Sequence, residues 1–282
     1  MAAEPIRTPG RKPVRTITVT SGKGGVGKTN MVANLAIALR KMGKDVMILD
    51  ADLGLSNIDV LLDLAPKYNI QHVISGEKTL EEVVIEGPYG IKILPASSGV
   101  QEMTELDEFQ RMRLVAEFDA YETDIDYLLV DTGAGISANV AFFCIASQEI
   151  VIVTSPEPTA LTDAYALIKV LFTNYQEKDF RVLVNSAKNS ADALEVFRRL
   201  SMAAEKFLNI SLDYLGYVPL DESVRNAVRK QKAFIDIYPG CDAALQVTGI
   251  ASRLNSETRG KVKGTLQLFI GNLLKGERNV PV

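Results

Sequence analysis

SGKGGVGKTN, residues 21–30, is the stretch that decides the fold. It contains the pattern G-x4-G-K-T from Gly22 to Thr29, and it lies between the β-branched run RTITVT (15–20) and a helical pattern that starts at Lys28. A strand, a glycine-rich loop and a helix in this order are what a phosphate-binding loop requires, because backbone N–H groups and the helix N-terminus then face an anion. We therefore expect a nucleotide site, the alternative being a tight glycine-rich turn without a ligand.

The residues of this loop have distinct expected parts. Lys28 is expected to reach the β- and γ-phosphates, and the Thr29 hydroxyl to bind Mg²⁺. The residues expected around the phosphates are Gly22, Lys23, Gly24, Gly25, Val26, Gly27, Lys28, Thr29 and Asn30. The pattern G-x4-G-K-T requires one lysine, which is Lys28, so the role of Lys23 needs a separate explanation.

The rest of the chain alternates between short β-branched runs and helical patterns. Seven runs are expected as strands: 15–20, 45–50, 91–96, 126–131, 149–155, 181–186 and 212–218. Apolar residues with helical spacing predict helices over 28–42, 159–172 and 191–207. This order predicts an α/β fold with a doubly wound, mainly parallel sheet of about seven or eight strands and helices on both faces.

Acidic residues end two of the predicted strands. Asp50 and Asp52 follow one apolar run, and Asp131 follows another. Because parallel strands place their carboxyl ends at one edge of the sheet, these aspartates can converge on the phosphate-binding loop. The alternative for Asp50 and Asp52 is that they only cap the following turn.

Composition narrows the class of protein. The chain has 282 residues, of which 47% are apolar and 23% charged, with a net charge of −4. This balance argues against a surface built wholly for nucleic acid, and we expect no sequence-specific nucleic-acid binding. The cysteines Cys144 and Cys241 lack metal-site spacing and are expected to be buried apolar residues, and His72 is the only histidine. With no signal-peptide pattern or apolar run of spanning length, we expect a cytoplasmic protein.

The segment KGGVGKT resembles the deviant Walker A group, the family of MinD, ParA and the nitrogenase iron protein, whose loop reads KGGxGK[ST]. In that family the first lysine crosses a dimer interface to the partner's phosphates. The resemblance implies that Lys23 does so here, that the protein is a slow, dimerisation-dependent ATP hydrolase, and that it forms a homodimer when it binds ATP and Mg²⁺. The alternative is a solvated loop lysine that attracts anions.

The same resemblance assigns further site residues. It implies that Asp131 is the Walker B carboxylate that holds magnesium through water, that Asp52 is catalytic together with Lys23 and Lys28, and that Asp50 acts through magnesium-bound water. Gly133 and Gly135 would let their loop approach the γ-phosphate. For adenine it implies a hydrogen bond from Asn185 and an apolar loop of Val218, Pro219 and Leu220. A strand-end asparagine is also an ordinary turn former.

Several stretches narrow the resemblance within the family. They are DADLGLSNIDVLL, ILPASSG, DTGAGIS, EPTALTDAYALIK and GYVPLDESVRNAVRKQKAF. Together they resemble the bacterial MinD-like flagellar number regulators called FlhG or FleN, which implies an FlhF-type GTPase or a FleQ-type transcription activator as partner and a place at the cell pole. Residues 1–14 contain no DQAxxLR motif, which lowers the expectation of GTPase stimulation by this segment. MinD-type division-site regulators and ParA-type partitioning ATPases are the alternatives.

The last part of the chain differs in composition. We expect a tail over 1–14, an ATPase domain over 15–255, and a linker with a final helix over 256–282. Five apolar residues lie on one face of that helix: Leu266, Phe269, Ile270, Leu273 and Leu274. Five basic residues and one acidic residue lie between Arg259 and Arg278. Such a helix suits peripheral contact with anionic lipids, the alternative being a helix packed on the sheet or on a partner.

Overall fold

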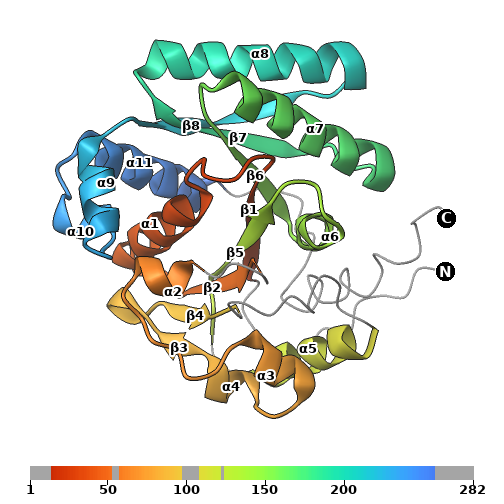
Figure 1. Cartoon of the computed structure of the whole chain (residues 1–282), viewed down its shortest axis with the longest axis vertical. Coiled ribbons are helices and arrows are strands. Elements are labelled where there is room, and N and C mark those ends of the chain that lie inside the picture. Colours follow the sequence, from red (N-terminus) through yellow and green to blue (C-terminus); the bar gives the residue numbers. More distant parts are fainter. Residues whose placement is uncertain (1–13, 53–56, 97–107, 122–123, 258–282) are drawn as a thin grey trace.

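The computed structural model describes residues 14–52, 57–96, 108–121 and 124–257. They form one eight-stranded sheet in the order β3-β4-β2-β5-β1-β6-β7-β8, with helices on both faces (Figure 1). All pairs are parallel except β3 with β4. The predicted fold class is confirmed, and the strand that leads into the glycine-rich loop lies inside the sheet between β5 and β6.

The strands correspond closely to the predicted runs. Their bounds are β1 Arg15–Ser21, β2 Val46–Ala51, β3 Ile85–Glu86, β4 Lys92–Leu94, β5 Tyr127–Ala134, β6 Glu149–Thr154, β7 Phe180–Ala187 and β8 Leu212–Pro219. Only β3 was not predicted. It has two residues and pairs antiparallel with β4 across the short 3₁₀ helix η1, Pro88–Gly90. Two residues are too few for an alternating pattern.

The helices lie in two layers. Their bounds are α1 Lys28–Lys41, α2 Ile58–Leu61, α3 Ile70–Ser75, α4 Leu80–Val83, α5 Glu108–Ala120, α6 Ala138–Ala146, α7 Pro158–Tyr175, α8 Ser190–Leu208, α9 Glu222–Arg229, α10 Phe234–Ile237 and α11 Asp242–Ser256. One core joins one face of the sheet to α1, α2, α9, α10 and α11. Two further cores join the other face to α3–α6 and to α6–α8.

Strand β1 is buried on both faces. Ile17 and Val19 belong to the core under α1, whereas Thr18 and Thr20 face the opposite layer and have no exposed surface. Because buried hydroxyls need partners, Thr18 donates to the Phe143 backbone oxygen at 3.0 Å, and the hydroxyls of Thr20 and Thr132 lie 3.0 Å apart. These bonds hold the strand that positions the loop.

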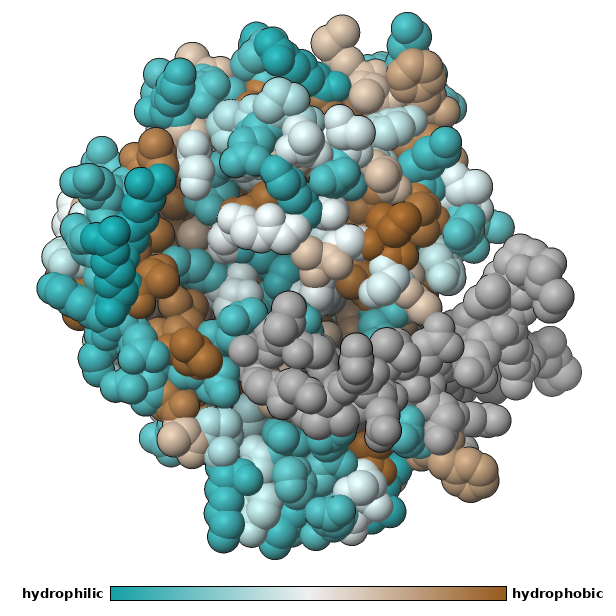
Figure 2. All heavy atoms as spheres, viewed as in Figure 1, coloured by the Kyte–Doolittle hydropathy of each residue, from teal (hydrophilic) through white to brown (hydrophobic). Residues whose placement is uncertain are grey.

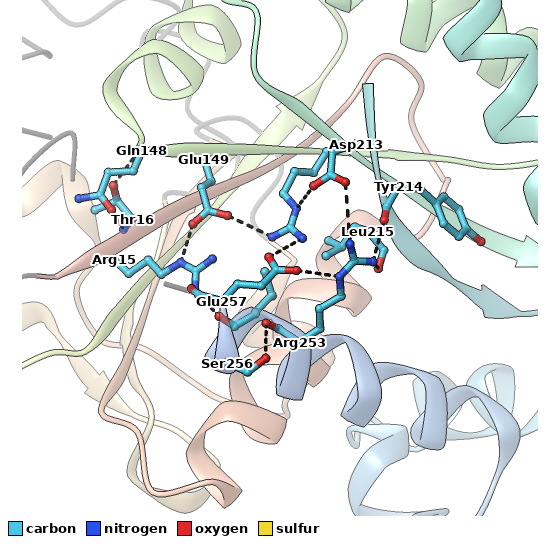
Figure 3. A network of polar contacts seen from close by, with 12 residues as sticks. Arg15, Thr16, Gln148, Glu149, Asp213, Tyr214, Leu215, Arg253, Ser256 and Glu257 are labelled. Atoms are coloured by element: carbon cyan, nitrogen blue, oxygen red, sulfur yellow. Dashed lines mark hydrogen bonds and ion pairs between the residues drawn. The ribbon is translucent and has the colours of Figure 1, made fainter. Parts of the chain in front are cut away.

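A charged network closes the amino ends of the strands. Arg181 at β7 is only 1% exposed, and its guanidinium lies 3.3 Å from Glu149 of β6, 3.1 Å from Asp213 of β8 and 2.9 Å from Glu257 after α11. Arg15 of β1 also bonds Glu149, and Figure 3 shows how these charges meet between the strand ends and the end of α11. A buried arginine is tolerated only with such partners.

Hydrophilic side chains cover parts of the surface, and the single histidine and the two cysteines have structural positions. On the face in Figure 2, hydrophilic side chains cover α9 at the left and the α3–α4 region at the bottom. His72 is half-buried and caps α3 together with Asn69. Cys144 is buried, as expected, whereas Cys241, also expected to be buried, is half-buried; both pack against apolar cores. None of the described helices is both long and apolar enough to cross a bilayer.

Candidate functional site

The glycines of the loop have separate structural reasons. Gly25 and Gly27 have φ of 80° and 90°, which side chains rarely adopt, and Gly27 is the N-cap of α1. An ideal Cβ on Gly22 would lie 2.1 Å from the backbone oxygen of Asp163 in α7, whereas one on Gly24 would meet nothing within 4 Å. The loop therefore packs against α7 at its first glycine and opens outward at the third position of the motif.

Lys28 and Asp131 form a buried ion pair. The Lys28 Nζ lies 2.7 Å from the Asp131 Oδ1, with side chains 8% and 1% exposed. Burial raises the pKa of Asp131, and Lys28 and a hydrogen bond from Thr29 counteract the rise only in part. An ammonium has three donors, so Lys28 retains two N–H groups with which a phosphate can be bound.

The three predicted aspartates do converge at the carboxyl edge of the sheet. Asp50 pairs in register with Asp131 and has no exposed surface, and its carboxylate accepts the backbone N–H of Asp52 at 3.1 Å. An ideal Cβ on Gly133 would lie 3.4 Å from the Asp52 Oδ1, so Asp52 lies against the loop after Asp131. The negative charge of Asp52 also acts to raise the pKa of Asp131. The Asp131 carboxylate, the buried Lys28 ammonium and the Asp52 carboxylate therefore lie together.

The arrangement fits a magnesium ion that is bound together with a nucleotide. Among the described residues, no group of three or more His, Cys, Asp or Glu side chains could hold a metal ion alone. The Thr29 hydroxyl nevertheless contacts the Asp131 carboxylate at the start of α1. Because Mg²⁺ binds through one or two protein ligands plus waters and phosphates, a hydroxyl beside one carboxylate is the donor set it uses in such loops.

Lys23 points to a different place from Lys28. Its Nζ lies 2.6 Å from the Glu157 carboxylate and 2.7 Å from the Thr159 hydroxyl, at the start of α7. Its side chain is 34% exposed, so it lies at the rim of the site. Glu157 and Thr159 were not predicted as neighbours of the loop. The available signal was EPT directly after the apolar run of β6, which puts these residues at the same edge of the sheet.

The predicted adenine residues are only partly brought together. Asn185 and Val218 are paired across β7 and β8, and the Asn185 side-chain amide donates to the Val26 backbone oxygen of the loop at 2.8 Å. Val218 was expected in an apolar loop, but it lies in β8 with no exposed surface, packed into the core under α1. Its side chain therefore cannot lie on a base. Leu220 is 57% exposed and remains available, beside half-buried Pro219.

The remaining predicted residues are of two kinds. Gly135 has φ of 100°, and its N–H donates to the Ser21 backbone oxygen at 2.9 Å, which joins the loop after β5 to the end of β1. The predicted membrane residues, Leu266, Phe269, Ile270, Leu273 and Leu274, lie outside the described residues.

The site suits phosphoryl transfer. Such reactions need positioning and electrostatic stabilisation rather than a covalent intermediate, and the N-terminus of α1 supplies a positive end with no acidic residue in its first turn. Lys28 adds a buried positive charge beside Thr29 and Asp131, the oxygen donors that suit Mg²⁺. Asp52 is half-buried at the rim of this group, where a carboxylate can orient a water molecule.

Comparison with known proteins agrees with this geometry. A ParA family model, described as NUBPL iron-transfer P-loop NTPase, matches residues 13–255. The chain is 44% identical to the antiactivator FleN of Pseudomonas aeruginosa over 93% of this chain and 94% of that protein. It is 35% identical to the flagellum site-determining protein YlxH of Helicobacter pylori, over 92% and 89% of the two chains.

Solved structures show the same fold. The chain superimposes on the MinC:MinD cell division protein complex of Aquifex aeolicus with a TM-score of 0.69 and 27% identity, over 88% of this chain and 98% of the other. For the septum site-determining protein MinD of Pyrococcus horikoshii with Mg-ADP, the TM-score is 0.72 and the identity 23%, over 86% and 96% of the chains. The second likeness bears on the fold alone.

Proposed function

The chain belongs to the ParA/MinD family of P-loop ATPases, and from this premise we propose that it is an ATP-dependent dimeric switch that regulates flagellar number. The observation that carries the switch is the contrast between its two loop lysines. Lys28 is buried on Asp131, whereas Lys23 lies at the exposed rim. This contrast supports a role for Lys28 in binding phosphate within the chain and a role for Lys23, now bonded to Glu157, in meeting a second subunit.

The proposed reaction is hydrolysis of Mg-ATP to ADP and phosphate. Lys28 and the loop N–H groups bind the phosphates, and Thr29 and Asp131 hold Mg²⁺, with Asp50 supporting Asp131 from the neighbouring strand. Asp52 orients the attacking water. Lys23 joins the partner's phosphates only in the dimer, so that hydrolysis is slow in the monomer and depends on dimerisation.

The flagellar role rests on similarity along nearly the whole chain. FleN is by its name an antiactivator, and YlxH is a flagellum site-determining protein. The proposed partners are therefore a FleQ-type transcription activator or an FlhF-type GTPase, each bound by the ATP dimer. Because dimerisation needs the γ-phosphate, the partner would respond to ATP rather than to ADP.

The proposed place of action is the cytoplasmic face of the membrane, at the cell pole. Support comes from the sequence of residues 264–275, where one helical face is apolar and basic residues flank it. Asn185, Pro219 and Leu220 are proposed to contact adenine, with Asn185 also holding the loop through Val26.

The experiment compares Lys23→Ala, Lys28→Ala and Asp52→Ala. Lys28→Ala should lose ATP affinity. Lys23→Ala should bind ATP yet stay monomeric and barely hydrolyse it, and Asp52→Ala should remain an ATP-bound dimer. Light scattering coupled to gel filtration, ATP titration and phosphate release measure the three properties. Lys206→Ala, an exposed lysine on α8, is the matched control and should behave as the parent chain.

The Asp52→Ala dimer also tests the biological role. In a pull-down with ATP it should retain a FleQ-type activator or an FlhF-type GTPase. Retention of a division inhibitor instead would replace the flagellar role with a division-site role. A Lys23→Ala protein that dimerises normally with ATP would refute the switch itself.

A further inference from the structure

A cluster of basic side chains lies on an otherwise acidic body. Residues 14–257 carry a net charge of −10, whereas residues 222–232, which form α9 and the turn towards α10, carry four basic residues and one acidic residue, a net charge of +3. The four basic residues are all exposed: Arg225, Arg229, Lys230 and Lys232. Within the described part of the chain none of them forms an ion pair, whereas Arg40 and Lys78 each pair with a carboxylate. Their charge is therefore available to an anionic partner.

Exposed apolar side chains accompany this cluster. Val228 is 43% exposed, and its spacing from Arg225 and Arg229 puts it on the same side of α9 as these arginines. Val60 of α2 is 56% exposed, and its backbone oxygen accepts the Gln231 side-chain amide at 2.9 Å, which joins α2 to the turn after α9. Figure 2 shows apolar side chains directly beside the hydrophilic ones of α9. The surface therefore combines positive charge with apolar area.

The elements that carry this surface are held in place at both ends of the basic stretch. The Asp221 carboxylate accepts the backbone N–H groups of Ser223 in α9 and Ala243 in α11, at 2.8 and 3.3 Å. The Asn34 side chain of α1, which has no exposed surface, accepts the N–H of Ile235 in α10 at 3.0 Å. A partner therefore binds a surface that is already ordered, without the free-energy cost of fixing a loose segment.

We propose that this surface binds a partner protein through a segment of acidic and apolar residues. We call it the α9 face, and it consists of Val60, Arg225, Val228, Arg229 and Lys232. The inference rests on the proposed function, because it names the surface on which the switch meets its flagellar partner. The partner's carboxylates pair with the basic residues, which favours rapid and oriented association, and its apolar side chains cover the two valines.

The α9 face lies beside the candidate nucleotide site. Strand β8 ends at Pro219, and only Leu220 and Asp221 separate it from α9 (Figure 1). Leu220 is 57% exposed and is one of the residues proposed to contact adenine. Helix α1, which starts at the glycine-rich loop, holds α10 through Asn34. A partner on the α9 face would therefore contact elements that adjoin the nucleotide site, which suits an output that depends on ATP.

An acidic protein segment fits the α9 face better than a nucleic acid does. Phosphates satisfy the basic residues but leave Val60 and Val228 in water, whereas a protein segment covers both kinds of side chain. The net charge of −10 on the body also repels a long polyanion that extends beyond the face. A short acidic segment ends within the face and avoids this repulsion.

The test measures the affinity of the full chain, as the Asp52→Ala variant with Mg-ATP, for a purified partner and for two soluble probes. The partner is the FleQ-type activator or the FlhF-type GTPase of the organism that encodes this chain. The probes are poly-L-glutamate and a random copolymer of glutamate and tyrosine. Adding R225Q/R229Q/K232Q should weaken binding of the partner and of the copolymer about tenfold, because three exposed ion pairs contribute about twofold each. Lys230 is kept, since its Nζ donates to the Tyr238 hydroxyl.

Two further variants serve as controls. R198Q/R199Q/K206Q removes the same charge from the exposed side of α8 and should change each affinity less than about twofold. Val228→Ser should weaken binding of the copolymer about threefold and leave binding of poly-L-glutamate unchanged, because only the copolymer has apolar side chains to bury. Thermal unfolding and ATP titration confirm that each variant is folded and binds nucleotide.

The α9 face and the proposed function fail in distinguishable ways. If neither flagellar protein binds the Asp52→Ala chain, the flagellar role is wrong, and the copolymer then decides whether the α9 face binds acidic segments. If R225Q/R229Q/K232Q binds the partner as the α8 control does, the α9 face is overturned and the proposed function stands. If this variant loses binding of duplex DNA but keeps binding of the copolymer, the face is also overturned, in favour of a nucleic acid.

Discussion

At the scale of single residues, the central feature of the site is the buried ion pair between Lys28 and Asp131. Both groups lie in the interior, where removal of one partner leaves the other charge without compensation. Loss of activity in a Lys28 variant therefore has two possible causes, lost phosphate binding and lost folding. Stability measurements distinguish them.

Lys28→Met should reduce the free energy of unfolding of the nucleotide-free chain by about 3–5 kcal/mol at neutral pH. Loss of the lysine raises the pKa of Asp131 further, since Lys28 is one of the groups that hold it down. A raised pKa means that the folded state binds the proton more tightly than the unfolded state. The loss should therefore be smaller at about pH 5 than at about pH 8, as measured by urea unfolding.

The control for this prediction is Lys28→Met combined with Asp131→Asn. Removing both charges leaves no uncompensated group, so the double variant should regain much of the lost stability and show little pH dependence. Equal losses at the two pH values in the single variant would mean that Asp131 is not the group responsible.

Gly22 and Gly24 offer a matched pair in one loop. Gly22→Ala forces a methyl group against the α7 backbone and should cost about 1–3 kcal/mol of unfolding free energy, together with ATP affinity. Gly24→Ala meets open space and should leave the stability of the fold nearly unchanged. Chemical denaturation and ATP titration measure both effects. Similar losses in the two variants would show that contact with α7 is not the reason for the glycine.

At the scale of elements, seven of the strands and three of the long helices could be predicted, whereas the other helices and one short strand could not. Strands such as β6 and helices such as α1 and α8 followed from runs of apolar residues, with boundaries within a few residues. The strand β3 and the four-residue helices α2, α4 and α10 escaped prediction because no periodicity develops over two to four residues. The longer helices α3, α5, α6, α9 and α11 were not predicted either.

In the candidate site, too, some residues could be predicted from the sequence and others could not. The loop and its aspartates were predictable because strand ends of a parallel sheet must meet at one edge. Glu157 and Thr159 were not recognised, because their contact with Lys23 depends on side-chain direction across a gap of more than a hundred residues. Val218 was misplaced because the apolar loop and the end of a buried strand have the same composition.

Asp221 provides a test of how one cap joins two elements. Its carboxylate accepts the N–H of Ser223 at 2.8 Å in α9 and that of Ala243 at 3.3 Å in α11. Burial alone would raise the pKa of Asp221, but these bonds lower it overall. Asp221→Ala should cost about 1 kcal/mol of unfolding free energy at neutral pH.

The pH dependence identifies the charge. A lowered pKa means that the contribution of Asp221 is present above its ordinary value near 4 and is lost as pH falls through the lower folded value. The parent chain should therefore lose part of its advantage over Asp221→Asn as the pH falls to about 3, as followed by urea unfolding. An advantage that stays constant with pH would assign the effect to the shape of the cap rather than to its charge.

At the scale of the whole molecule, the two ends of the strands carry different groups. The carboxyl ends carry the nucleotide site with Lys28 and Asp131, and the amino ends carry the network around Arg181. The strands β1 and β6 pair side by side, so the nucleotide site and the Arg181 network lie at opposite ends of the same part of the sheet.

The proposed dimer predicts a concentration effect on thermal unfolding. ATP at about a hundred times its Kd should stabilise the folded chain by about 2.7 kcal/mol through binding alone. In the parent chain the unfolding temperature with ATP should also rise with protein concentration, because association adds to binding. In Lys23→Ala the stabilisation by ATP should remain and the dependence on protein concentration should vanish, as scanning calorimetry at several concentrations measures.

The contact of Arg15 with the end of α11 also brings the two ends of the described body close together. A domain of this kind should tolerate insertion into a surface loop of a host protein, because the host needs only a narrow opening to accept both ends. If ATP pairs two bodies, it would then pair two hosts. The closeness of Arg15 and Glu257 thus makes this body a candidate for an insertable, nucleotide-controlled dimerisation cassette.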